Sequence, residues 1–108
     1  SRLEGLTKAY STSLLVSEDV LKKVEHPEKY FYRHLDTVKV KGKNQAVHIL
    51  EILNGNSPRI IDLKMKLKPL FEEGIANYTA KKFKQAKNIF TKVLKEDPKD
   101  KAAELYID

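Results

Sequence analysis

The side chains of this sequence that could do chemistry are charged groups rather than nucleophiles. The chain has no cysteine, which excludes disulfide scaffolds, thiolate zinc sites and cysteine nucleophiles. Its three histidines, His26, His34 and His48, are scattered and are typical of loop or strand residues rather than of metal ligands. The sequence shows no pair of carboxylates at a convincing metal-binding spacing, no glycine-rich phosphate loop and no Ser-His-Asp arrangement. On the residues alone, none of these patterns identifies a catalytic site.

The cations are mostly lysines. There are 21 basic and 15 acidic residues, which give a net charge of +6, but Arg2, Arg33 and Arg59 are the sole arginines. Proteins that recognise bases usually use arginine, because its planar fork is bidentate and lysine is a point charge. The lysines are spread along the whole chain with acidic residues between them. We therefore expect a solvated lysine-rich surface and no nucleic-acid partner.

Length and composition predict a soluble globular chain of one modest domain or two small subdomains. The sequence has 108 residues, 41% of them hydrophobic and 33% charged. No apolar run approaches the roughly 20 residues needed to cross a bilayer, and no signal peptide opens the chain. We expect a cytoplasmic location. The start, Ser1–Glu4, is typical of the middle of a helix, which predicts a piece of a longer protein that could be membrane-anchored upstream.

The elements that must position these cations begin with alternating helix and strand signals. Helical spacing of Leu3, Leu6 and Tyr10 predicts a helix over residues 1–10. The apolar run at residues 14–16 is suited to a buried strand. After it, a serine followed by two acidic residues predicts a capped helix from residue 18 that ends before the proline at position 27.

A β-hairpin is predicted next. Residues 30–40 and 46–53 have β-prone or apolar patterns, and the turn Lys41–Asn44 contains Gly42, which can adopt a positive φ. The second strand is apolar on both parities, which predicts that both of its faces are covered. The tip of this hairpin carries two positive charges, Lys41 and Lys43.

The last half of the chain has helical patterns. Residues 54–58 form the clearest break, and Ser57 with Pro58 predicts a short helix over Arg59–Lys66. Pro69 predicts the start of another, because proline is tolerated in a first turn. Residues 69–96 should form two antiparallel helices joined at residues 80–82, and a third should begin at Ala102. The helices are expected to pack through Gly74, Phe83, Ala86 and Phe90.

Two motifs in the first half resemble the class III nucleotidyl cyclases. Residues 1–7, SRLEGLT, resemble the end of the family's asparagine-x-x-x-arginine helix. Residues 31–43, FYRHLDTVKVKGK, and residues 47–53, VHILEIL, resemble the last β-hairpin of the catalytic domain. The resemblance covers residues 1–53 and implies an α+β piece of that domain, built of helix, strand, helix and β-hairpin.

The resemblance also implies an activity. Enzymes of this family form dimers that convert ATP or GTP to a 3′,5′-cyclic nucleotide and pyrophosphate for intracellular signalling, with Mg or Mn held by two aspartates. It implies that Arg2 stabilises the pentavalent phosphorus and that Lys41 binds the substrate phosphates, with Lys43 as a weaker second candidate. On the residues alone, these side chains are typical of a solvated helix arginine and a charged hairpin tip.

The resemblance further implies that the piece is incomplete. The family's asparagine would fall just before Ser1, and the metal-binding aspartates and base-selecting residues lie further upstream. We therefore expect this chain to bind no metal and to be inactive by itself. The choice between ATP and GTP is left open.

Residues 69–98 resemble a single tetratricopeptide (TPR) repeat. The matching residues are Gly74, Tyr78, Phe83, Ala86, Phe90 and Pro98. Leu70 and Asn77 depart from the usual tryptophan and tyrosine. A lone repeat buries little surface, so its open face should rest on the third helix, on the cyclase piece or on a protein partner. Bacterial cyclases that end in such a hairpin support the pairing, as a resemblance.

The sequence thus predicts a cyclase piece over residues 1–53, a linker with a short helix over 54–68, and a TPR-like hairpin with the start of a third helix over 69–108. The leading function is that of an enzyme fragment. The alternative is a non-catalytic interaction module built from a degenerate cyclase remnant and the hairpin. A nucleic-acid binder, which rests on charge alone, ranks last.

Overall fold

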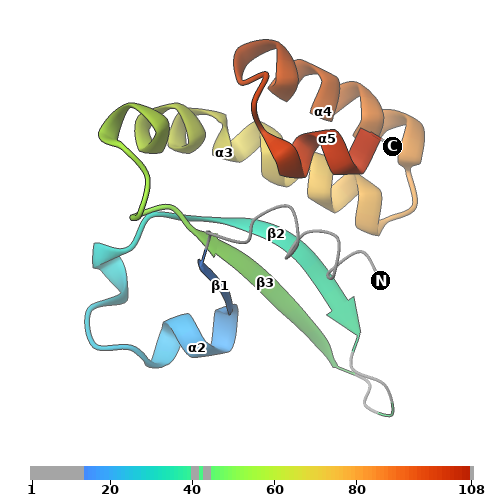
Figure 1. The fold of residues 1–108 in the computed structure, drawn as a ribbon. Coiled ribbons are helices and arrows are strands. Elements are labelled where there is room, and N and C mark those ends of the chain that lie inside the picture. The colour runs from blue at the N-terminus through green and yellow to red at the C-terminus, as the bar shows by residue number, and fades with distance from the viewer. Residues whose placement is uncertain (1–13, 40–41, 43–44, 108) are drawn as a thin grey trace.

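The structure, a computed structural model, describes residues 14–39, 42 and 45–107. These residues form a three-stranded antiparallel sheet with helices on both faces, a mixed α+β fold (Figure 1). The strands are β1 (Leu14–Ser17), β2 (Tyr32–Lys39) and β3 (Ala46–Ile52), and β3 lies in the centre. The helices are α2 (Glu18–Lys23), the 3₁₀ turn η1 (Pro27–Lys29), α3 (Pro58–Thr79), α4 (Phe83–Glu96) and α5 (Lys101–Ile107). The helix predicted over residues 1–10 lies outside the described residues.

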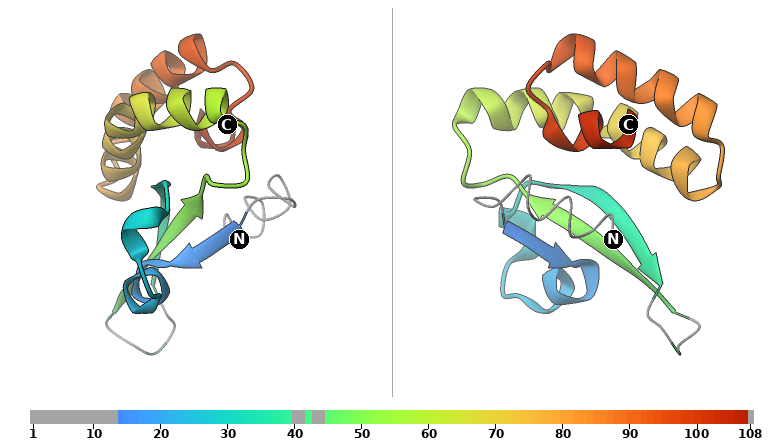
Figure 2. Two further views of the ribbon diagram at one scale, coloured as in Figure 1. Left: turned by 90° about the vertical axis from the view of Figure 1, so that its left-hand side faces the viewer. Right: turned by 45° about the vertical axis from the view of Figure 1, so that its right-hand side comes forward.

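The helices form two layers around the sheet. Helices α3, α4 and α5 lie on one face, and α2 lies on the other (Figures 1 and 2). We call the buried apolar cluster on the first face the helix-side core: Leu35, Leu67, Phe71, Ile75, Ala86, Phe90, Val93, Ala102, Ala103 and Tyr106. We call the buried group on the other face the α2-side cluster: Leu21, Leu50 and Ile52. Within the described residues, no helix has the length and apolar character that crossing a bilayer requires.

The capped helix after the first strand is confirmed. Ser17 has an extended backbone, and its Oγ accepts a hydrogen bond from the Val20 amide at 3.2 Å. Glu18 and Asp19 occupy the first turn, where negative charge offsets the exposed amides. The helix ends at Lys23, a few residues before the proline that was expected to stop it.

The β-hairpin is confirmed as well. Strands β2 and β3 pair in antiparallel register as far as Lys39 and Ala46. Gly42, in the turn between them, has a φ of 83°, the left-handed conformation that glycine adopts without steric cost. The prediction that the second strand is covered on both faces holds for residues 50–52, which are buried, and not for residues 46–49, which are exposed or half-buried. The far end of the hairpin extends beyond the helices (Figure 1).

Helix α3 runs without interruption through Pro69. The prediction of a short helix over Arg59–Lys66 and a second one from Pro69 is therefore wrong. An internal proline removes one backbone hydrogen bond and clashes with the preceding turn. Leu67 and Phe71, on either side of it, are both buried in the helix-side core, so tertiary packing keeps the helix continuous. The helix changes direction along its length, as an internal proline leads one to expect (Figure 2).

The start of α3 follows its local signal. Ser57 has an extended backbone and accepts a hydrogen bond from the Ile60 amide at 3.4 Å, with proline at the next position. Residues 58–68 of the predicted linker thus belong to α3, and two of them, Lys64 and Leu67, are buried. The helix is part of the packed body of the protein.

Helices α3 and α4 form the predicted antiparallel pair. They are joined by residues 80–82 and approach closely at Gly74. A Cβ atom added at Gly74 would lie 2.8 Å from Cζ of Phe90, whose ring is fully buried. The third helix, α5, begins at Lys101, close to the predicted position.

The prediction that Phe83 packs between the helices is wrong. Its side chain is 54% exposed. Phe83 is the first residue of α4, just after the turn that ends α3, so it lies at the end of the helix pair and is only partly covered. Its ring contacts the edge of the Tyr78 ring, with 5.0 Å between the centroids.

Candidate functional site

The predicted catalytic residue, Arg2, and the predicted phosphate-binding residues, Lys41 and Lys43, lie outside the described residues. The structure does describe the strand ends on both sides of the turn that carries the two lysines, where Lys39 pairs with Ala46. The roles of the three cations accordingly remain predictions. The described part of the site is the hairpin that carries the lysines and the groups that hold it.

Strand β2 contains a bulge at Leu35. The register shifts between His34 and Asp36, so Leu35 is an extra residue opposite β3. A bulge bends its strand and redirects a side chain. Here the Leu35 side chain is fully buried in the helix-side core, and its carbonyl oxygen accepts a hydrogen bond from the Tyr106 hydroxyl at 2.6 Å. The bulge residue of β2 is thus hydrogen-bonded to α5.

Next to the bulge, Arg33 is buried between the sheet and the helices. Its Nη1 and Nη2 atoms donate to the two carboxylate oxygens of Asp100 at 2.7 and 2.9 Å. Its Nε donates to Glu51, the residue opposite it on β3, at 2.8 Å. The guanidinium carbon lies 4.0 Å from the centroid of the Phe71 ring on α3. Such a bidentate, stacked geometry is specific to arginine.

Asp100 joins three elements at this point. Besides Arg33, it accepts a hydrogen bond from the amide of Ala103 in the first turn of α5 at 3.3 Å. The Lys64 ammonium on α3 lies 3.6 Å from Asp100 and donates to Asp97 at 2.9 Å. Burial alone would raise the pKa of Asp100. Hydrogen bonding and the charge of Arg33 outweigh burial, with help from Lys64 and Ala103, and lower the pKa from 3.8 to about 2.

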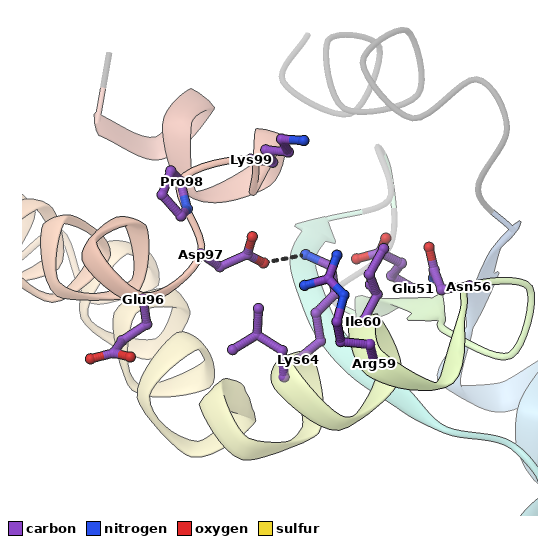
Figure 3. Close-up of a pocket in the computed structure, with 10 residues that line it drawn as sticks. Glu51, Asn56, Arg59, Ile60, Lys64, Glu96, Asp97, Pro98 and Lys99 are labelled. Atoms are coloured by element: carbon purple, nitrogen blue, oxygen red, sulfur yellow. Dashed lines mark hydrogen bonds and ion pairs between the residues drawn. The ribbon is translucent and has the colours of Figure 1, made fainter.

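A cavity of about 470 Å³ lies beside this network (Figure 3). Its lining residues are Glu51, Asn56, Arg59, Ile60, Leu63, Lys64, Glu96, Asp97, Pro98 and Lys99. The figure shows the Lys64–Asp97 contact at its centre. The cations and carboxylates of this lining are equal in number, so the cavity lacks the field of one sign that would attract a polyanion such as a triphosphate.

Two of the histidines meet across the hairpin. Nε2 of His34 lies 2.7 Å from the Asp36 carbonyl, and it must donate there because a carbonyl oxygen only accepts. The Thr37 hydroxyl lies 2.9 Å from the same Nε2 and 3.1 Å from Nδ1 of His48. Both rings therefore take part in the hydrogen bonding of the hairpin. Both histidines are strand residues, which agrees with the prediction of loop or strand residues.

Metal ligands are not assembled in the described part of the chain. Over residues 14–39, 42 and 45–107, no group of three or more His, Asp or Glu side chains could hold a metal ion. The carboxylates of the buried network face Arg33 and Lys64 instead. These residues do not fit a magnesium or manganese site.

Sequence reasoning missed the buried ion pairs. Arg33 and Asp100 are 67 residues apart, and no local pattern connects them. Glu51 lies opposite Arg33 because of the bulge at Leu35, whereas regular pairing continued from Lys39 and Ala46 would place Ile52 there. No local signal marks this bulge, so the cross-strand charge pair could not be predicted from the sequence either.

Comparisons with known proteins give two related sequences. The terminal-differentiation specific adenylate cyclase of Dictyostelium discoideum is 31% identical over 108 residues, which are 99% of this chain and 5% of that protein. An adenylate cyclase of Anabaena cylindrica is 45% identical over 53 residues, which are 48% of this chain and 11% of that protein. No family model and no solved structure matches the chain. The chain therefore contains a region related to adenylate cyclases, and it spans a small part of these relatives' lengths.

Proposed function

We propose that this chain is the C-terminal part of a class III nucleotidyl cyclase catalytic domain, followed by a TPR-like helical hairpin. The enzyme would be a lyase that converts ATP, or GTP, into a 3′,5′-cyclic nucleotide and pyrophosphate for intracellular signalling. The observation that carries the proposal is the β2–β3 hairpin, with Gly42 at positive φ between Lys41 and Lys43, in a chain that is 31% identical over 108 residues to an adenylate cyclase. Because both relatives are named adenylate cyclases, ATP is the favoured substrate.

The cations of the chain would act on the phosphates. In this reaction the 3′-hydroxyl attacks the α-phosphate in line and pyrophosphate leaves, so negative charge grows on the phosphoryl oxygens. Fixed cations aimed at that charge stabilise the transition state. We assign this role to Arg2 and triphosphate binding to Lys41, with Lys43 as a second candidate. A divalent ion would supply Lewis-acid chemistry, but the described residues do not fit one, so we derive no step through it.

The remaining groups would come from outside the chain. In the proposed homodimer, the metal-binding aspartates belong to one protomer and the asparagine, arginine and lysine to the other. The 108-residue chain should then turn over neither ATP nor GTP with magnesium or manganese present. Cyclic nucleotide formation by the purified chain would contradict this division of the site.

The test of the proposal is a transplant. The segment of the Dictyostelium enzyme that matches this chain is replaced by residues 1–108, and cyclic AMP production is measured. Arg2→Ala should lower kcat by roughly a hundred- to thousandfold with little change in KM, because a transition-state contact is lost. Lys41→Ala should also raise KM for ATP, because its charge meets phosphates already present in the ground state.

The control is Lys87→Ala, which removes an exposed cation of α4 and should leave both constants unchanged. Full activity of both Arg2→Ala and Lys41→Ala would reject the site assignment. A transplanted enzyme that folds but makes no cyclic AMP would favour the alternative, an interaction module whose TPR-like hairpin binds a protein partner.

A further inference from the structure

We infer that helices α3–α5 position the β2–β3 hairpin, and that Asp100 is the positioning residue through which they hold it. The inference rests on the proposed function, because it concerns the hairpin that carries Lys41 and Lys43. It assigns to the helices a role in the reaction that the TPR-like resemblance does not contain. The residues that carry it are far from the turn.

The helical part of the chain binds β2 at three consecutive residues. Arg33 is bound by Asp100 in a bidentate pair, and the backbone amide of His34 donates to the Glu72 carboxylate on α3 at 2.7 Å. The Leu35 carbonyl accepts from a tyrosine of α5 at 2.6 Å. Asp36, the next residue, is 2% exposed. One side chain and two backbone groups of β2 are thus bonded to α3, to α5 and to the residue that caps α5.

Among the described residues, positions 37–39 of β2 and 46–49 of β3 have no such bonds to the helices. Beyond residue 36 the side chains of β2 are half-buried or exposed, and so are residues 46–49 of β3. This part projects past the helices in Figure 1. The direction of the outer hairpin is therefore set at residues 33–36.

A small change at the base becomes a large displacement further out. The three residues from Asp36 to Lys39 span roughly 10 Å at about 3.3 Å per residue. A rotation of about 10° at the base would then move the strand end by roughly 2 Å. Misplacing a catalytic group by about 1 Å is enough to lower a rate on the order of a hundredfold. A small change in the angle between the hairpin and the helices would thus be enough to lower the rate of the proposed reaction.

Asp100 is the residue on which these contacts converge. It is 1% exposed, and it binds β2 through Arg33, α5 through the Ala103 amide and α3 through Lys64. Asparagine has the same shape and keeps an oxygen for the Ala103 amide, but it opposes an amide N–H₂ to the guanidinium. Asp100→Asn is therefore a selective way to release Arg33.

The first experiment measures the geometry in the 108-residue chain. The chain contains no cysteine, so Lys39→Cys and Lys92→Cys attach one spin label to the exposed end of β2 and one to the exposed side of α4. The parent should give one narrow distance distribution by double electron–electron resonance. Asp100→Asn should broaden or shift it. Tyr106→Phe, which removes one hydroxyl and keeps the ring, should do so to a smaller extent and decides the matter if Asp100→Asn fails to fold.

The matched control is Val93→Ala. Val93 is fully buried in the helix-side core, and its truncation lowers Tm without removing a hydrogen bond or an ion pair to β2. It should leave the distance distribution narrow. If Asp100→Asn kept the parent distribution, or if Val93→Ala broadened it equally, the inference would be overturned.

The second experiment uses the transplanted cyclase. There Asp100→Asn should lower kcat/KM for ATP about tenfold or more, while Val93→Ala, assayed well below its Tm, should not. A broadened distribution with unchanged kinetics would overturn the positioning role. An inactive transplant would reject the proposed function instead, and the distances would still decide whether Asp100 fixes the hairpin.

Discussion

On one face of the sheet, Leu35 joins a core of buried residues from α3, α4 and α5, and Arg33 is bound by a carboxylate that caps α5. On the other face, α2 has six residues, of which Leu21 is the buried one, and Val20 is 51% exposed. Among the described residues, many more apolar side chains are therefore buried on the α3–α5 face than on the α2 face. Since burial of apolar area is the main stabilising contribution, the described sheet depends chiefly on α3, α4 and α5.

The two faces also differ in chemistry. The α2-side cluster is apolar, whereas the contact with α3–α5 contains Arg33, Glu51, Lys64, Asp97 and Asp100, all buried. Buried ion pairs add little net stability, but removal of one partner leaves a charge without compensation. The helix face should thus be the more sensitive to single substitutions. The helical segment, which sequence patterns separate from the hairpin, is structurally its main partner.

The largest expected effect is that of Arg33→Ala. It leaves Glu51 and Asp100 buried without their cation, and we expect a loss of about 3–5 kcal/mol in the free energy of unfolding. On the other face, Leu21→Ala should cost about 2 kcal/mol, because the side chain lies in a small cluster with two residues of β3. Urea denaturation measures both. Arg59→Ala, at an exposed arginine, is the control. Equal losses of stability on the two faces would contradict the claim that the α3–α5 face is the more sensitive one.

Local signals explain how much of this fold is predictable. Ser17, Ser57 and Gly42 act on their immediate neighbours, so the two caps and the turn follow from the sequence. Pro69 is the counterexample, because packing on both sides of it outweighs its local preference. Local patterns do not predict the structure at positions where long-range packing outweighs the local preference.

The site was less predictable than the fold. Arg2 and Lys41 were assigned by resemblance, and the described residues do not include them. The Arg33–Asp100 pair joins a strand and a helix cap 67 residues apart, and the bulge that places Leu35 depends on the helices that receive it. Such contacts depend on the tertiary packing of segments that are distant in the sequence, so local patterns do not predict them.

The second prediction concerns the interior of the helix face. Gly74→Leu should destabilise the chain by roughly 1–3 kcal/mol, because even a Cβ there would lie 2.8 Å from the Phe90 ring. The ring is held by a stacked contact with Tyr106 and an edge contact with Phe71, so it cannot move aside freely. Thermal melts measure the loss. Lys82→Leu, on the exposed turn, should change little. A parent-like melt for Gly74→Leu would mean that residue 74 does not lie in a tight helix crossing.

The third prediction concerns pH. The pKa of Asp100 in the folded chain is about 2, below its ordinary value of 3.8, so its contribution is fully present above about pH 4 and is lost as the pH falls toward 2. A shift of this size corresponds to about 2 kcal/mol. The free energy of unfolding should therefore fall over this range, and Asp100→Asn should flatten the fall. Asp62→Asn, at an exposed position of α3, should not. If the free energy of unfolding of Asp100→Asn fell with pH as steeply as that of the parent, Asp100 would not be stabilised by Arg33 in the folded chain.

The smallest effect tests where the helix-side core ends. Phe83→Ala should cost only about 0.5–1 kcal/mol, because the ring is 54% exposed and its edge contact with Tyr78 is its main packing. Phe90→Ala, at a fully buried ring, should cost about 3–5 kcal/mol. Urea denaturation of the two variants compares the same side chain at the first residue and in the middle of one helix. If Phe83→Ala lowered the free energy of unfolding as much as Phe90→Ala, the helix-side core would extend to the turn between α3 and α4. The residues that contact the sheet would then be a smaller part of that core.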